Sequence, residues 1–278
     1  MKKRIIIISS FLIIISTMLL SLFLIPQKNI KEVFGVWWWN DQLESEKYLS
    51  FAQEHNITEI YYCSSELGSV TSNFIKSANK KGISVYWLQG EYEWLDNISS
   101  VSKKVEKYLK YQNDNPNARF NGIHFDIEPH QNPEFKTRRQ ELILNLIRLA
   151  NQMKETYPNI LFDYDIPFWL NDEIYFNNVS KPAYEHMIDI SNRIFVMSYR
   201  DTADKIKDIT KEELAYAASV NKKLILSVET SSNEGDNVSF LEEGKQVMMT
   251  QLNILKEEYG NSIGIAIHHI KSWYDLKE

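Results

Sequence analysis

Apolar and polar positions follow two different periods along this chain. From residue 32 onward, short runs rich in β-branched and aromatic residues alternate with longer stretches that are amphipathic or polar. The short runs are typical of strands and the longer stretches of helices. Eight strand-like runs can be counted: Val33–Trp39, Ile57–Cys63, Ile83–Leu88, Gly122–Glu128, Ile160–Ile166, Arg193–Tyr199, Lys223–Glu229 and Ile263–His269.

The stretches between these runs are long enough for helices that cross over between parallel strands. The predicted helices are Glu44–His55, Ser69–Lys81, Ile98–Gln112, Pro133–Tyr157, Pro182–Ile190, Thr202–Val220 and Phe240–Tyr259. Only Lys271–Glu278 remain after the last strand, so the eighth helix is predicted to be short or absent. This alternation predicts an α/β fold, a single closed (β/α)8 TIM barrel, and an open doubly wound sheet is the second choice.

Composition agrees with a single globular domain. The chain has 278 residues, of which 44% are hydrophobic, and this length is close to the roughly 250 residues of one barrel. The net charge is -6, and acidic and basic residues are interspersed rather than gathered in a basic stripe. Nucleic acid is therefore excluded as a partner.

The N-terminus has the charge order of an export signal. Lys2, Lys3 and Arg4 precede an apolar run from Ile5 to Ile25. The run approaches the ~20 residues that span a bilayer, which favours a retained anchor over a cleaved signal peptide. We therefore assign residues 1–29 to a signal-anchor or signal peptide and residues 30–278 to the barrel. The barrel is predicted on the extracytoplasmic face of the cell membrane, or secreted if the segment is cleaved.

In barrels of this kind, the active site lies at the carboxyl ends of the strands. The ends of the predicted strands are rich in polar and aromatic residues, namely Trp37, Trp38, Trp39, Gln89, Asp126, Glu128, Asp163, Asp165, Tyr199, Glu229, His268 and His269. The two-residue period of a strand places His124, Asp126 and Glu128 on one face, toward the interior. Crowded carboxylates raise the pKa of one of them, as a general acid requires, although a purely structural acid–histidine network is the alternative.

The segment from Asn121 to Pro129 resembles the fourth strand of the family-eighteen glycoside hydrolases, the chitinase-like group, which carries D-G-x-D-x-D-x-E. Gly122, Asp126 and Glu128 match that motif. Asn121 and His124 stand where the family has its first two aspartates. On the sixth strand, the sequence Met-Ser-Tyr at residues 197–199 resembles the family's M-x-Y motif.

The resemblance implies a glycosidase that acts on a glycan with N-acetylated sugars and needs no cofactor. It implies that Glu128 protonates the glycosidic oxygen, that Asp126 orients the N-acetyl group as an internal nucleophile, and that Tyr199 supports that group. Substrate-assisted hydrolysis is a recognised exception to the two-carboxylate scheme. Further residues are predicted to bind the substrate: Trp37, Trp39, His124, Asp165, Glu229, His268 and Trp273.

Three alternatives remain open. A retaining glycosidase of clan A would use Glu128 as the acid and Glu229 as the nucleophile, about 5–5.5 Å apart. A metal-dependent hydrolase would use the alternating His124, Asp126, Glu128 and His130, although Pro129 is expected to turn His130 away from the strand face. A non-catalytic, membrane-tethered barrel would bind glycans without cleaving them. We predict no bound metal.

Overall fold

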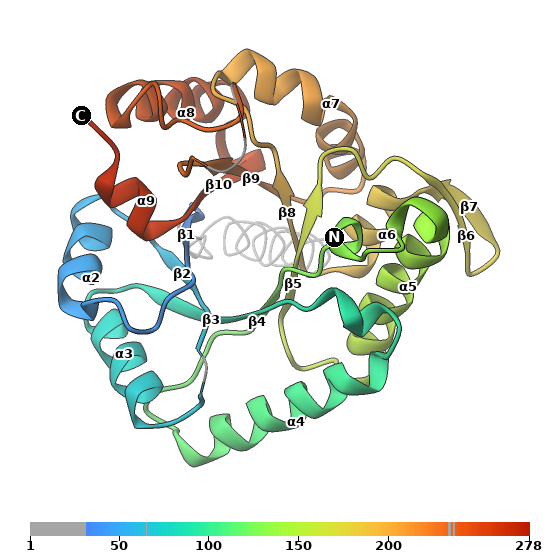
Figure 1. Ribbon diagram of the computed structural model, residues 1–278, viewed down its shortest axis with the longest axis horizontal. Helices are drawn as coiled ribbons and strands as arrows, with labels where there is room; N and C mark the ends of the chain where they lie inside the picture. Colours follow the sequence, from blue (N-terminus) through green and yellow to red (C-terminus); the bar gives the residue numbers. More distant parts are fainter. Residues whose placement is uncertain (1–31, 65, 233–234, 236) are drawn as a thin grey trace, which may run out of the picture. The chain divides into compact units, whose positions relative to one another are not determined.

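The computed structural model describes residues 32–278, apart from residues 65, 233–234 and 236. Eight parallel strands close into a barrel (Figure 1). Their order around the barrel is β1 (Phe34–Trp38), β2 (Glu59–Tyr62), β3 (Ser84–Gln89), β4 (Ile123–Phe125), β5 (Phe162–Pro167), β8 (Arg193–Met197), β9 (Leu224–Glu229) and β10 (Ile263–His268), which pairs with β1. The predicted TIM barrel is confirmed. The segment 1–29 lies outside the described residues.

Helices surround the barrel on its outer side (Figure 1). They are α2 (Ser45–Glu54), α3 (Ser69–Lys80), α4 (Ile98–Asp114), α5 (Phe135–Thr156), α6 (Ala183–Ile190), α7 (Ala203–Ser219), α8 (Lys245–Tyr259) and α9 (Ile270–Asp275). The last of these has six residues, as expected for a short eighth helix. Within the described part of the chain, none of the helices combines the length and the apolar character needed to cross a membrane.

Side chains that alternate along the strands fill two separate layers. On β1, Trp37 points into the barrel, where its ring lies 5.0 Å from that of Tyr61 and 5.9 Å from that of Phe195. The next residue, Trp38, points outward and packs 4.8 Å from Phe74 of α3. Each such side chain contributes about 1.5–3 kcal/mol when fully buried. The β-branched and aromatic runs thus supply both the barrel interior and the surface on which the helices pack.

An ion-pair network lies inside the barrel near the amino ends of the strands. Arg193 of β8 donates to both oxygens of Asp163 on β5, at 2.9 and 2.5 Å, and to Glu59 of β2, at 2.8 Å. Its guanidinium also lies 4.5 Å from the ring centre of Tyr86. Asp163 therefore belongs to this network, and the expectation that it sits at the carboxyl end of its strand was wrong.

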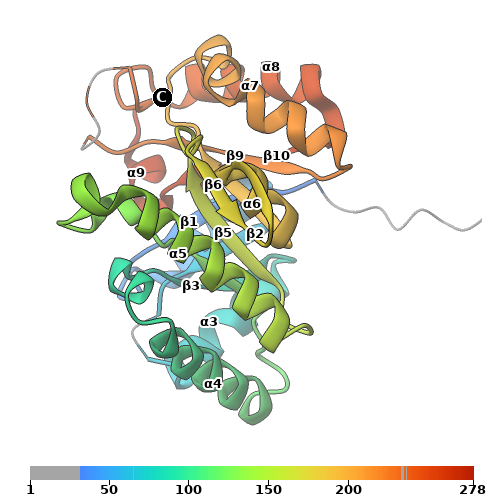
Figure 2. The same cartoon turned by 90° about the vertical axis from the view of Figure 1, so that its right-hand side faces the viewer.

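A short hairpin after β5 was not among the predicted elements. Its strands are β6 (Glu173–Phe176) and β7 (Val179–Pro182), and it lies outside the helical ring next to α6 (Figures 1 and 2). Asn177 and Asn178 form its turn with φ of 49° and 65°. Asparagine tolerates this left-handed conformation, which two-residue hairpin turns require.

Candidate active site

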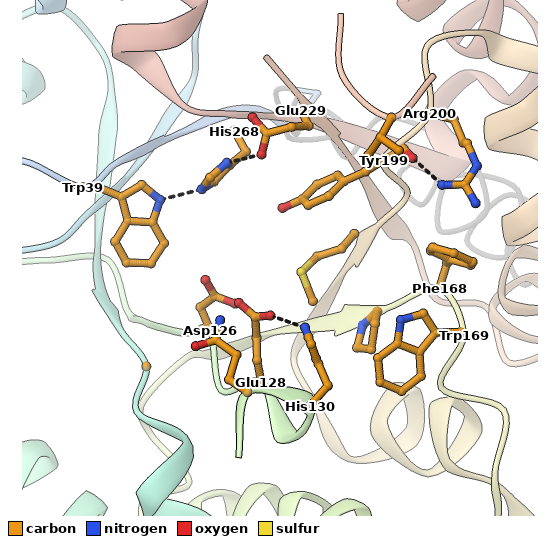
Figure 3. A pocket seen from close by; sticks show the side chains of 15 residues that line it. Trp39, Asp126, Glu128, His130, Phe168, Trp169, Tyr199, Arg200, Glu229 and His268 are labelled. Atoms are coloured by element: carbon orange, nitrogen blue, oxygen red, sulfur yellow. Dashed lines mark hydrogen bonds and ion pairs between the residues drawn. The ribbon is translucent and has the colours of Figure 1, made fainter. Parts of the chain in front are cut away.

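A cavity of about 690 Å³ opens at the carboxyl ends of the barrel strands. This is the end at which TIM barrels carry their active sites, and the volume is within the usual range for a small-molecule or sugar site. Figure 3 shows the side chains around it. The lining residues are Trp39, Gly90, Asp126, Glu128, His130, Gln131, Pro167, Phe168, Trp169, Met197, Tyr199, Arg200, Glu229, Val238 and His268.

The segment after β4 carries acidic side chains into this cavity. Asp126 continues the strand pairing by one residue, because its backbone N–H donates to the carbonyl of Gln89 at 2.9 Å. Gly90 makes the approach possible, since a Cβ at that position would lie 1.8 Å from the carbonyl oxygen of Asp126. Phe125 and Ile127 are buried in the outer layer, so the alternate residues Asp126 and Glu128 point to the cavity side. The predicted alternation is therefore present.

Glu128 projects from the lower edge of the cavity in Figure 3. Its side chain is 18% exposed, and its Oε2 lies 2.8 Å from Nε2 of His130, within ion-pair distance. The ring of His130 in turn lies 5.3 Å from that of Trp169. The chain leaves the strand at Pro129, as expected, and the 3-10 turn η2 (Pro129–Gln131) then places the His130 imidazole beside Glu128 at the cavity.

Asp126 shares the floor of the cavity with two fully buried groups. His124 lies on the same face of β4, and its Nε2 is 2.8 Å from Oδ2 of Asp165 on β5. Burial, reinforced by neighbouring carboxyls, raises the pKa of both Asp126 and Asp165 well above the ordinary value. Burial also lowers the pKa of His124 to about 3, so this imidazole is neutral and donates from Nε2.

Tyr199 lies on the opposite side of the cavity from Asp126, with its hydroxyl pointing inward (Figure 3). Its ring lies roughly parallel to that of His268, with centroids 6.2 Å apart. Burial, together with the negative charge of Asp126, raises the pKa of Tyr199 well above 10. The phenol therefore stays protonated and can donate a hydrogen bond to a ligand.

Glu229, at the end of β9, is held on both oxygens. Oε1 accepts from the backbone N–H groups of Thr230 and Ser231 at 2.6 and 2.7 Å, and Oε2 pairs with Nδ1 of His268 at 2.6 Å. Burial opposes ionisation of Glu229, but these hydrogen bonds keep its pKa below the ordinary value. The side chain is only 1% exposed. This carboxylate borders the cavity, but both of its oxygens are engaged by donors of the protein.

Two opposing effects act on the pKa of His268. Burial disfavours its charged form, yet the Glu229 carboxylate more than offsets this and raises the pKa of His268. On the other side of the ring, the indole N–H of Trp39 donates to Nε2 at 2.6 Å, which requires Nε2 to be unprotonated. His268 therefore cannot be protonated at Nε2 and accept the hydrogen bond from Trp39 at the same time. The neutral ring with its proton on Nδ1 satisfies both Trp39 and Glu229.

The structure corrects several predicted substrate-binding residues. Trp37 is 1% exposed inside the barrel, and Trp273 is fully buried against Phe34 and Phe51. Neither ring lines the cavity. His124 and Asp165 lie beneath the cavity and do not line it. Trp39, Glu229 and His268 do line it. A strand-end position in the sequence does not tell whether the side chain points inward, outward or below a neighbour.

Sequence reasoning missed Arg200 and left His130 aside. Arg200 directly follows the predicted Tyr199, donates to its carbonyl oxygen at 2.7 Å and lies 4.8 Å from the ring centre of Phe168. Its place next to a predicted site residue was the available signal. In the described part of the chain, no three histidine, cysteine or acidic side chains are arranged to hold a metal ion. The metal-dependent alternative therefore lacks a ligand set there.

No protein-family model and no curated protein matches this chain. Solved structures do match. A mutant class V chitinase from Nicotiana tobaccum in complex with NAG4 has a TM-score of 0.56 at 12% identity, over 87% of this chain and 95% of that one. A chitinase from Bacteroides thetaiotaomicron has a TM-score of 0.55 at 14% identity, over 87% and 90%. The glycoside hydrolase domain of PelA from Pseudomonas aeruginosa has 0.52 at 8%, over 88% and 98%.

These likenesses confirm the resemblance to chitinase-like barrels at the level of the fold. At identities of 8 to 14%, they show the fold but not the chemistry. The function has to be argued from the side chains of the site.

Proposed function

We propose that this chain is a retaining glycoside hydrolase that cleaves a glycan next to an N-acetylated sugar by substrate-assisted catalysis. The observation that carries the proposal is that Asp126, Glu128 and Tyr199 face one cavity at the catalytic end of the barrel. The bound sugars of structurally similar chitinases support the choice of substrate, since the Nicotiana tobaccum enzyme is in complex with NAG4.

In the proposed reaction, Glu128 gives its proton to the glycosidic oxygen while the bond from that oxygen to the anomeric carbon breaks. The carbonyl oxygen of the substrate's acetamido group attacks the anomeric carbon and forms an oxazolinium ion. Water then attacks the same carbon, and the Glu128 carboxylate takes a proton from it, so the configuration is retained. His130 would orient Glu128 through its close contact with Oε2.

Two other groups would act on the acetamido group. The Asp126 carboxylate would accept its N–H and make the carbonyl oxygen more nucleophilic, and the Tyr199 hydroxyl would hold that oxygen in place. Neither role needs a second carboxylate as nucleophile. Glu229, which the clan A alternative requires as nucleophile, has both oxygens engaged by protein donors and is almost fully buried.

The experiment that tests this proposal compares matched oligosaccharides with and without N-acetyl groups. The enzyme should release products from N-acetylglucosamine oligomers and not from their fully deacetylated counterparts, because the internal nucleophile is missing in the latter. Proton NMR at early times should show the anomer of the retained configuration. Equal cleavage of both substrates, or an inverted product, would rule out substrate assistance, and binding without cleavage would favour a non-catalytic glycan-binding barrel.

We also propose that residues 1–29 tether the barrel to the extracytoplasmic face of the cell membrane. The basic residues before the long apolar run support this orientation. Fractionation of cells expressing the full-length chain should find it with membranes. Protease added outside the intact cell membrane should degrade the barrel, because it faces outward, while a cytoplasmic marker protein stays protected. Recovery of a shortened chain in the medium would instead indicate cleavage and secretion.

A further inference from the structure

We propose that Asp165 is a positioning residue that shares one proton with Asp126, and that His124 holds the Asp165 carboxyl in the orientation needed for this. The kinetic part of this inference rests on the proposed function, whereas the shared proton itself does not. In the described part of the chain, no lysine or arginine contacts either carboxyl, so neither carboxyl belongs to an ordinary ion pair.

The strand register brings the two carboxyls together. His124 and Phe125 of β4 pair with Asp163 and Tyr164 of β5, so the next pair along is Asp126 and Asp165. Neighbouring strands lie about 4.8 Å apart, and paired residues point to the same face. In both side chains, Oδ1 is buried and has no hydrogen-bond donor from the protein within the described residues.

Asp165 is buried, and Asp126 is half-buried at the floor of the cavity. Two adjacent carboxylates in this setting cannot both be charged at low cost. Their repulsion is strong where water is excluded, and two unsatisfied acceptor oxygens add a desolvation penalty. A single proton between the two groups removes both problems, because one carboxyl then donates to the other. The pair would titrate as a unit, with the second proton leaving at unusually high pH.

His124 decides which oxygen of Asp165 remains for Asp126. The imidazole is completely buried, and its Nε2 occupies Oδ2 of Asp165. Its ring is fixed by aromatic neighbours, with the ring centre of Tyr61 at 4.3 Å and that of Phe195 at 4.5 Å. With Oδ2 engaged, Oδ1 is the atom of Asp165 left to share the proton.

The shared proton would serve the reaction without leaving the pair. When the acetamido group binds, Asp126 has to be the anion that accepts its N–H, and the proton then resides on Asp165. The protonated Asp165 stabilises the Asp126 anion by donating a hydrogen bond to it. No charge enters or leaves the floor of the cavity during this shift.

Other charged or titratable groups also face the pair. From the cavity side they are Glu128, Tyr199 and His268, with Glu229 behind His268. From the barrel interior it is Asp163, which is paired with Arg193. Because these groups are present in every variant of the pair, the role of Asp165 is read from the difference between variants rather than from one titration curve.

The first test needs no substrate. At about pH 8, where ordinary Asp and Glu side chains are ionised, infrared spectra of the full-length protein should show the C=O stretch of a protonated carboxyl group. The band should disappear in Asp165→Asn and in Asp126→Asn. Glu213→Gln is the matched control, because burial raises the pKa of that remote helix residue to about 7. Absence of the band in the parent protein, or its persistence in both pair variants, would overturn the proposal.

The second test follows the pH dependence of kcat/KM. Asp165→Asn keeps the geometry, since an amide can accept from His124 and donate permanently to Asp126. This variant should stay within about tenfold of the parent at neutral pH, while Asp165→Ala should lose about a hundredfold. In Asp165→Asn the alkaline limb of the pH profile of kcat/KM should move to higher pH by about one unit or more, because the amide cannot lose the shared proton.

An unchanged alkaline limb in Asp165→Asn would contradict the positioning role even if the rate fell, because a merely structural loss does not shift the limb. Circular dichroism of each variant checks that it folds. If the parent protein cleaves no substrate, the proposed function fails, and the infrared result still decides whether the proton is shared.

Discussion

The ionisable side chains His124, Asp126 and Glu128, on the inner face of β4 and of the segment that follows it, differ in how far they reach toward water. His124 is completely buried, whereas the Glu128 side chain is 18% exposed and points into the cavity. This gradient separates their chemistry, because burial keeps His124 neutral while Glu128 can meet a substrate. The acid of the proposed reaction is therefore the one carboxyl of the row that is both accessible and held by a neighbour, His130.

At this scale, the sequence predicted which residues share a face but not what each one contacts. The period of two placed His124, Asp126 and Glu128 together, and the structure agrees. The partner of His124 is Asp165, which lies 41 residues away in the chain. Such a pair depends on the register between two strands, which a single sequence does not reveal.

The raised pKa of Asp126 makes a prediction about stability. Because the folded-state pKa lies above that of the unfolded chain, the folded state is favoured while the group is protonated, and this advantage is lost as the pH rises. The free energy of unfolding of Asp126→Asn, relative to that of the parent, should therefore increase from about pH 4 to about pH 8. Denaturant unfolding at both pH values measures this, and a difference that does not change with pH would contradict it.

At the scale of elements, the ends of β1, β9 and β10 meet through one hydrogen-bonded chain. Trp39 donates to His268, and His268 pairs with Glu229. The strand ends were predicted to carry these residues, but the predictions treated each one as a separate substrate contact. The structure instead makes Glu229 the support for His268 and leaves Trp39 at the cavity surface.

This chain of contacts predicts that two substitutions shift the pKa of His268 in opposite directions. Glu229→Gln removes the carboxylate that favours the imidazolium, so the pKa of His268 should fall. Trp39→Phe removes the donor that keeps Nε2 unprotonated, so the pKa should rise. NMR titration of the His268 ring proton measures both variants, with the remote His55 as internal control. Shifts of the same sign in both variants would show that the ring is not held between these two partners.

Element boundaries also explain what the sequence could not supply. The segment predicted as a strand from Gly122 to Glu128 forms β4 over Ile123–Phe125 and one further backbone hydrogen bond at Asp126, before the chain turns at Pro129 into η2. That turn returns His130 to the site. The hairpin β6–β7 was missed because its short strands are largely exposed and show no clear apolar period.

At the scale of the whole barrel, the eight consecutive strand–helix units in the sequence were sufficient to predict closure. The pattern could not predict the interior ion-pair network. Arg193 joins β2, β5 and β8 through Glu59 and Asp163, which lie 134 and 30 residues from it in the chain. Contacts at such separations follow from barrel closure and not from local periodicity.

The network makes a prediction about the stability of the barrel. Arg193→Met leaves two buried carboxyls without their cation, which should lower the free energy of unfolding by about 3–5 kcal/mol. Arg148→Met, on the exposed face of α5, is the matched control and should change it by about 0.5 kcal/mol or less. Urea unfolding measures both, and a similar small effect for the two variants would show that the network does not hold the barrel together.

The central claim is that Glu128 is the acid of a glycosidase, and product release by the full-length chain purified in detergent tests it most directly. The parent protein and Glu128→Gln are incubated with N-acetylglucosamine oligomers, with the exposed Glu134→Gln as control. The account predicts cleavage by the parent and the control, and a loss of about a hundredfold or more in Glu128→Gln with the fold intact. Equal cleavage by Glu128→Gln, or binding of the oligomers by all three proteins without any cleavage, would contradict it.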